Sequence, residues 1–85
     1  MDPIGIIIVD DHPLFREGVR NVLDAEEGMQ VLGEGVSGEQ AVELIRDLRP
    51  TVALVDVNLP VLNGIQVTRQ ISADRLGTSI VLLTA

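Results

Sequence analysis

The chain has 85 residues and a formal net charge of −7 at pH 7, enough sequence for one small domain. It has no cysteine, which excludes disulfides and thiol chemistry, and all its basic residues are arginines with no basic patch among them, which argues against nucleic-acid binding by this chain. No run approaches the roughly 18 apolar residues of a membrane span, and the acidic start is unlike a signal peptide, so we expect a soluble cytoplasmic protein.

The first half of the chain predicts two strands, each followed by a helix. Ile4–Val9 is a short β-branched apolar run, typical of a strand buried on both faces of a parallel sheet. Pro13 suits the first turn of a helix, which apolar residues at helical spacing carry to a stop near Gly28. Residues 30–36 predict a weaker strand. Ser37 then caps a second helix, whose inward stripe consists of Ala41, Leu44, Ile45 and Leu48.

The second half predicts two more strands around a third helix. Residues 52–57, "VALVDV", form the second strongly buried strand, and "NLPVLNG" is a turn-rich loop. Asn63 can cap a helix whose inward face consists of Ile65, Thr68 and Ile71. Residues 80–84, "IVLLT", form a last buried strand. The order βαβαβαβ implies an α/β fold: a parallel sheet with right-handed crossovers and helices on both faces.

Polar side chains stand where three of these strands end. Asp10 and Asp11 follow the first strand, Asp56 lies near the end of the 52–57 strand, and Thr84 ends the last one. Ligands of open α/β sheets bind beyond the carboxyl ends of the strands, so three carboxylates converge if the two strands are neighbours. Adjacent aspartates repel each other. Mg²⁺, which binds through a few carboxylates plus waters and phosphate oxygens, would compensate that repulsion.

Non-catalytic interpretations of these residues stay open at this point. Asp11 alone could cap the helix that begins at Pro13, and Asp56 alone could be a turn residue. Acids at both strand ends together favour a cation site. His12 is interpreted as a solvated or loop-orienting residue. Arg16 and Arg20, one helical turn apart, are interpreted as a solvated helix face.

The stretches "VDDHPLFREGV" and "VALVDVNLPVLNG" closely resemble the receiver domain of two-component response regulators, in the subgroup with a C-terminal helix-turn-helix DNA-binding domain. The resemblance covers the whole chain and implies a flavodoxin-like sheet. It implies that Asp56 is the phosphoacceptor and that Asp11 ligates Mg²⁺ directly, with Asp10 acting mainly through water. It further implies that Asn58 offers its backbone carbonyl to the metal. Thr84 would be the hydroxyl that swings toward the phosphoryl group.

The same resemblance implies partners and missing parts. A sensor histidine kinase would supply the phosphoryl group, and catalysis would be at most self-catalysed transfer and hydrolysis at Asp56 rather than enzyme activity. Phosphorylation would control dimerisation or transcription, with DNA bound through an absent C-terminal domain and no membrane involved. The family's lysine, fifth strand and last two helices do not occur in the sequence. We therefore expect residues 1–85 to be the N-terminal part of a receiver domain.

Two other functions compete with this interpretation. A Mg²⁺-dependent phosphatase with an aspartate nucleophile would commonly carry a second acid two residues after Asp56, where this chain has Asn58. Alternatively, the chain is a fragment that mainly self-associates, because "IVLLT" would leave an apolar edge strand and uncovered core surface.

Overall fold

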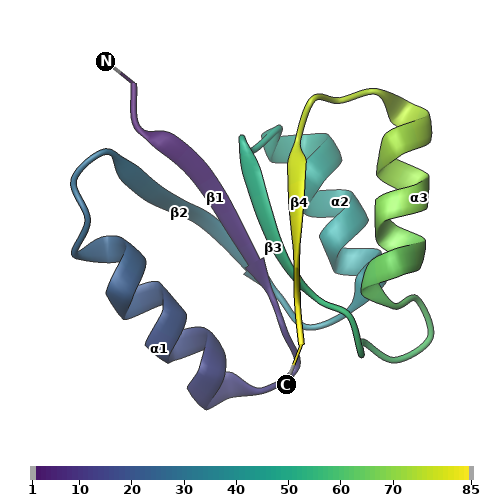
Figure 1. Ribbon diagram of the computed structural model, residues 1–85, viewed down its shortest axis with the longest axis horizontal. Coiled ribbons are helices and arrows are strands. Elements are labelled where there is room, and N and C mark those ends of the chain that lie inside the picture. Colours follow the sequence, from purple (N-terminus) through teal and green to yellow (C-terminus); the bar gives the residue numbers. More distant parts are fainter. Residues whose placement is uncertain (1, 85) are drawn as a thin grey trace.

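Residues 2–84 are described by the computed structural model, and they form a four-stranded sheet flanked by three helices (Figure 1). The sheet order is β2-β1-β3-β4, with β1 (Ile4–Val9) and β3 (Val52–Asp56) in the centre and β2 (Met29–Gly35) and β4 (Ser79–Leu83) at the edges. All three strand pairings are parallel. The predicted α/β fold with a flavodoxin-like strand order is therefore confirmed.

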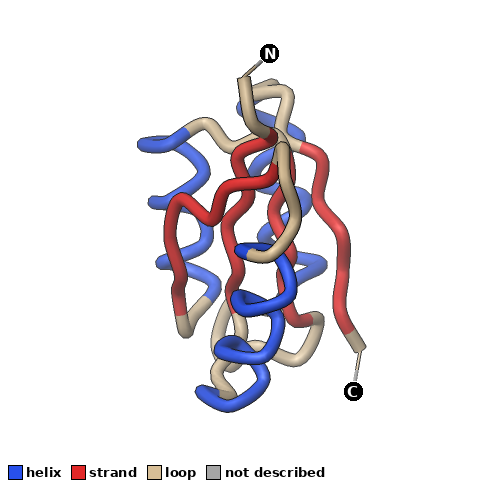
Figure 2. The backbone as a smooth tube through the Cα atoms, turned by 90° about the vertical axis from the view of Figure 1, so that its left-hand side faces the viewer, coloured by secondary structure: helices blue, strands red, loops and turns tan. Residues whose placement is uncertain are grey.

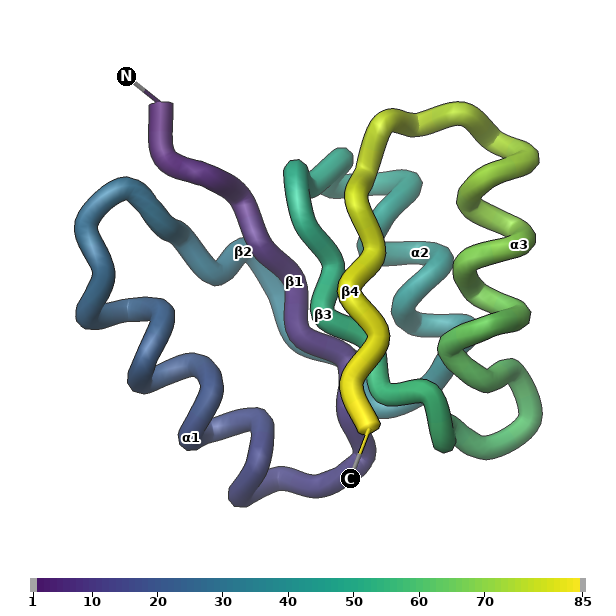
Figure 3. The backbone as a smooth tube through the Cα atoms, in the orientation of Figure 1, coloured from purple at the N-terminus to yellow at the C-terminus, as the bar shows by residue number. Residues whose placement is uncertain are grey.

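The helices lie on both faces of the sheet, as predicted. α2 (Gly38–Leu48) and α3 (Gly64–Asp74) cover one face together, whereas α1 (Pro13–Asp24) lies alone on the other face. Figure 2 shows α1 in front of the strands, and Figure 3 shows the paths of all three helices. The main core therefore lies between the sheet and α2 and α3. Its buried members are Ile7, Val9, Ala41, Val42, Ile45, Ala53, Val55, Leu59, Val67 and Ile71.

The element boundaries follow the sequence pattern closely. β1 has the predicted bounds, and the other strands differ from the predicted 30–36, 52–57 and 80–84 by one residue at one or both ends. α1 ends at Asp24, short of the predicted stop at Gly28, and Gly28 instead adopts a φ of 85° in the turn that leads into β2. Among residues 2–84, no helix is long and apolar enough to cross a membrane.

The rotation of α3 differs from the prediction. Val67 and Ile71 are buried and Thr68 is half-buried, but Ile65 faces solvent instead of the core. Gly64, the first residue of the helix, lies so near the end of β3 that an added Cβ would be 2.8 Å from the last carbonyl oxygen of the strand. This contact fixes which side of α3 faces the sheet, and Ile65, one position further round the helix, turns outward.

The inward face of α2 is shifted at its C-terminal end. Ala41 and Ile45 are buried and Leu44 packs against the core, as predicted, but Leu48 is largely exposed and Val42 is buried instead. α2 packs against α3 as well as against the sheet, so its apolar face is wider than one stripe.

α1 leaves much of its apolar surface uncovered. None of its described residues is buried, and Leu14 is 84% exposed. A groove of about 380 Å³ runs along the helix, lined by Leu14, Phe15, Gly18, Val19, Val22 and Leu23. The sheet also has an open edge, because β4 pairs only with β3 among the described strands.

Candidate functional site

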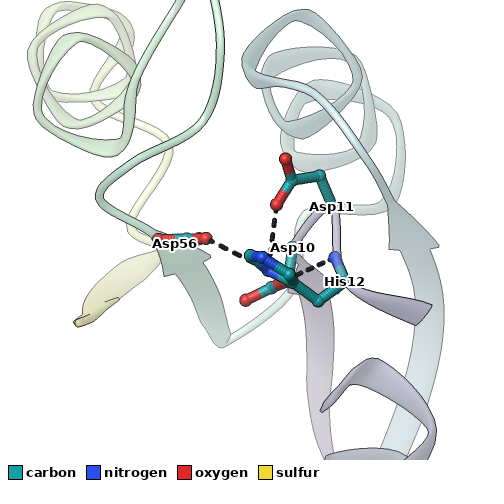
Figure 4. Close-up of side chains that lie close together, drawn as sticks. All are labelled: Asp10, Asp11, His12 and Asp56. Carbon is teal, nitrogen blue, oxygen red and sulfur yellow. Dashed lines mark hydrogen bonds and ion pairs between the residues drawn. The ribbon is translucent and has the colours of Figure 1, made fainter. Parts of the chain in front are cut away.

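The two central strands bring the predicted acids together. Val9 of β1 is the register partner of Val55 of β3, so Asp10 and Asp56 come next at the same edge of the sheet. Asp11 lies beside them, at the start of the loop that leads to α1 (Figure 4). Asp10, Asp11, His12 and Asp56 each offer a ligand atom, and these atoms all lie within 4.8 Å of one another. We call these four residues the acidic cluster.

The two buried acids are each held by a backbone turn. Asp10 and Asp56 are both 4% exposed. Oδ1 of Asp10 accepts a hydrogen bond from the backbone N–H of His12 at 2.7 Å, and Oδ1 of Asp56 accepts one from the backbone N–H of Asn58 at 2.9 Å. Buried carboxylates need such partners. Each acid is therefore fixed through its Oδ1 to the loop that follows its strand, and Oδ1 of Asp10 also contacts the ring of His12.

The open question about Asp11 is settled by the start of α1. The N-cap residue of α1 is His12, and within the described part of the chain no side chain caps this helix. Asp11 is thus not a helix cap, and its carboxylate lies 3.0 Å from Nδ1 of His12 instead. Asp56, in contrast, does serve as a turn residue through Asn58 and belongs to the cluster as well.

His12, interpreted as a solvated or loop-orienting residue, is exposed and closes the loop after β1, and its ring also contacts the acids. Its Nδ1 lies 2.8 Å from Oδ1 of Asp10 and 4.0 Å from Oδ2 of Asp56, although the side chain is 66% exposed (Figure 4). The hydrogen bond with Asp10 and then the charge of Asp11 raise the pKa of His12 above its ordinary value of 6.5. A protonated ring at this position offsets part of the repulsion among the carboxylates.

Thr84 closes the site on the β4 side. Asp56 and Leu83 are register partners, so Thr84 follows at the same sheet edge. A small pocket of about 50 Å³ is lined by Asp10, Phe15, Asp56, Leu83 and Thr84. The sheet topology therefore gathers Asp10, Asp11, Asp56 and Thr84. Asn58 follows in the turn after β3, with its N–H bonded to Asp56.

The donor set suits a hard divalent cation. Three carboxylates converge at one sheet edge, and two of them are almost fully buried. Carboxylate oxygens are the protein ligands that Mg²⁺ prefers, usually together with waters and phosphate oxygens. The acidic cluster could therefore hold a metal ion, with the half-exposed side of Asp11 and His12 open to solvent.

The sequence analysis missed the role of Arg16. Its side chain is only 18% exposed, and its Nη1 donates a hydrogen bond to the carbonyl oxygen of Asp10 at 2.7 Å. Arg16 and Arg20 also both pair with Glu34 of β2, so the prediction of a plain solvated face is wrong. The sequence did hold a signal for this contact, because Arg16 lies in the first turn of the helix that follows the acids and its side chain can reach back to them.

Comparisons with known proteins point to one family. A profile described as the response regulator receiver domain matches residues 6–85. The transcriptional regulatory protein DegU of Brevibacillus brevis is 47% identical over 68 residues, which is 80% of this chain and 29% of that protein. The nitrate/nitrite response regulator protein NarL of Escherichia coli K12 is 34% identical over 83 residues, covering 98% of this chain and 38% of that protein.

A solved receiver-domain structure has the same fold as this chain. The signal receiver domain of a NarL protein from Mycobacterium tuberculosis matches with a TM-score of 0.97 at 38% identity, over 100% of this chain and 68% of that one. The chain thus spans 29% and 38% of the lengths of the two curated relatives, and about two thirds of this solved domain.

Proposed function

This chain belongs to the response regulator receiver domain family, and on that premise we propose that Asp56 is its phosphoacceptor. The observation that carries the proposal is the state of the Asp56 carboxylate. It is buried at the carboxyl end of a central strand, one oxygen is fixed by the N–H of Asn58, and the other faces the acidic cluster. A fixed carboxylate with one free oxygen suits nucleophilic attack on a phosphoryl group.

The proposed reaction is a transfer between two side chains. Receiver domains of response regulators interact with histidine kinases, and the phosphohistidine of such a kinase is the proposed donor. An oxygen of Asp56 attacks phosphorus, the P–O bond forms, the P–N bond breaks, and the released imidazole takes up a proton. A divalent cation, Mg²⁺ in this proposal, would neutralise the charge of the incoming group.

The contacts of Asp10 and Asp11 support the roles proposed for these two acids. Asp10 already uses Oδ1 for two contacts with His12, which supports an indirect role through water. Asp11 is more exposed, and among residues 2–84 its carboxylate pairs with the His12 ring alone, which supports direct ligation. We assign the backbone carbonyl of Asn58 to the metal. Thr84 lines the pocket beside Asp56, where its hydroxyl can donate to an attached phosphate.

The wider function is proposed from the relatives. DegU and NarL are named as regulators and are longer than this chain. We propose that residues 1–85 are the N-terminal part of a receiver domain that controls a separate DNA-binding domain in the cytoplasm. The chain itself would bind no nucleic acid and would have no activity beyond phosphotransfer and hydrolysis at Asp56. A phosphatase is less well supported, because Asn58 stands where the second acid would be.

Phosphorylation by a small-molecule donor tests the proposal directly. The chain is incubated with acetyl phosphate and Mg²⁺, and the intact mass is recorded. A gain of one phosphoryl group is expected in the wild type and none in Asp56→Asn, whose amide oxygen can still accept from Asn58. Equal phosphorylation of the two proteins would overturn the assignment of Asp56.

Self-association is a second proposal, supported by two exposed features. The groove along α1 is apolar, and β4 presents one unpaired row of backbone donors and acceptors within the described sheet. Both features favour contact with a second copy of the chain. The receiver assignment does not depend on this association.

A further inference from the structure

Arg16 ties the acid-bearing end of β1 to its surroundings. Nη1 of Arg16 donates to the carbonyl oxygen of Asp10 at 2.7 Å, and Nε lies 3.5 Å from Oε1 of Glu34 on β2. The N–H of Asp10 donates to the carbonyl oxygen of Gly35 at 3.1 Å. Both backbone groups of Asp10 are therefore held, one by β2 and one by Arg16.

We propose that Arg16 is a positioning residue for the cation site, acting through the backbone of Asp10. The carbonyl that Arg16 holds belongs to the peptide group joining Asp10 to Asp11. Fixing this carbonyl fixes the plane of that peptide, in which the N and Cα atoms of Asp11 lie, and so restricts the directions in which the Asp11 side chain can leave the backbone. The inference rests on the proposed function, because it assigns Arg16 a role only if the acidic cluster binds a cation.

Asp11 needs this help more than the other two acids do. Asp10 and Asp56 are buried and held by turns of their own, whereas Asp11 is more exposed and contacts the ring of His12 alone among the cluster residues. Ligation of Mg²⁺ demands well-placed oxygens. An anchored peptide group supplies that placement for an otherwise loosely held side chain.

Simple electrostatics predicts the opposite effect of Arg16. A guanidinium beside three carboxylates repels an incoming cation, so removing its charge should strengthen Mg²⁺ binding. If Arg16 positions the site, removing its side chain should instead weaken Mg²⁺ binding. The sign of the change in Mg²⁺ affinity therefore separates the two effects.

Arg20 provides a matched control within the same helix. Like Arg16 it pairs with Glu34, and it also lies 3.6 Å from Asp24, but it makes no hydrogen bond to Asp10. Arg20→Gln and Arg16→Gln remove the same charge and the same kind of ion pair. They differ in the contact with the Asp10 carbonyl.

The test is a Mg²⁺ titration of the full chain, in which amide NMR spectra recorded at each Mg²⁺ concentration give the affinity. We expect Arg16→Gln to weaken the affinity on the order of tenfold, as loss of an outer support of a metal site does. Arg20→Gln should leave it unchanged or slightly tighter. Arg16→Lys, which keeps the charge and one donor, should restore part of the loss. If Arg16→Gln does not fold, Arg16→Met, which keeps an apolar stem but has no donor, replaces it in the test.

Each outcome has a defined meaning. Unchanged or tighter binding by a folded Arg16→Gln, or by Arg16→Met where Arg16→Gln does not fold, would overturn the inference and leave the proposed function intact. Equal weakening in both glutamine variants would assign the effect to Glu34 and α1 packing, which also overturns it. Failure of the wild type to bind Mg²⁺ would overturn the proposed cation site itself.

Discussion

Nδ1 of His12 lies 2.8 Å from Oδ1 of Asp10, so the imidazole ring stands among the carboxylates to which a cation would bind. The backbone N–H of His12 bonds to the same oxygen. One residue therefore closes the turn after β1 with its backbone and, when its ring is protonated, offsets part of the negative charge of the cluster. The acidic cluster thus contains a basic group of its own, which directly follows Asp10 and Asp11 in the sequence.

The proximity of the acids predicts a raised pKa for His12. NMR titration of the ring in Mg²⁺-free protein should give a value above 6.5, and Asp10→Asn should lower it, because the hydrogen bond to Asp10 is the main cause of the shift. The folded protein then binds this proton more tightly than the unfolded chain. Its stabilising effect is complete below pH 6.5 and is lost as the pH rises through the folded-state pKa. A value at or below 6.5 would contradict the geometry.

Asp11 and Asp10 should respond differently to loss of charge. Asp11→Asn is expected to reduce Mg²⁺ affinity by about tenfold or more with little change in thermal stability, because its side chain is partly exposed. At a pH above the pKa of His12, Asp10→Asn should instead raise the stability of the Mg²⁺-free protein, because the amide oxygen can still accept from the His12 backbone while one of three converging carboxylate charges is removed. Calorimetric titration and thermal unfolding of both variants measure the two effects. An Asp11→Asn variant with wild-type affinity would refute direct ligation.

Much of the fold could be predicted because its strands have distinct patterns. β1 and β3 are nearly continuous apolar runs, which are typical of strands covered on both faces of a sheet. Pro13 marks the start of α1 because proline suits the first helical turn, and Asn63 marks the start of α3 because its side chain caps free backbone N–H groups. The rotation of α3 could not be predicted in the same way. It depends on the close approach of Gly64 to the end of β3, which is a tertiary contact.

For the candidate site, the sequence allowed the convergence of the acids to be predicted, but not the contacts of His12 and Arg16. Asp10, Asp11 and Asp56 follow strands, and parallel strands end at one edge, so their convergence follows once β1 and β3 are neighbours. The direction of the His12 ring and the reach of Arg16 depend on loop geometry and on side-chain rotamers. Neither quantity has a periodic signature in the sequence.

Two glycines should respond in opposite directions to alanine. A Cβ on Gly38 would lie 1.8 Å from the backbone oxygen of Leu62, so Gly38→Ala should destabilise the fold by about 2–4 kcal/mol. Gly18, within α1, has no atom within 4 Å of such a Cβ, and Gly18→Ala should stabilise by up to about 1 kcal/mol. Denaturant unfolding of both variants checks the pair. Similar stabilities would mean that Gly38 does not touch the loop containing Leu62.

Self-association through the α1 groove predicts a site-specific effect of added charge. Leu14 lines the groove and is 84% exposed, so Leu14→Glu should shift the chain toward monomer without unfolding it. Val61→Glu is the matched control, because Val61 is also exposed but lies outside this groove. Light scattering over a concentration series, at low and high salt, measures the mass. Salt should favour association by screening the net charge of −7 that repels the copies. A wild type that stays monomeric throughout, or equal effects of the two variants, would exclude the α1 groove as the contact between copies.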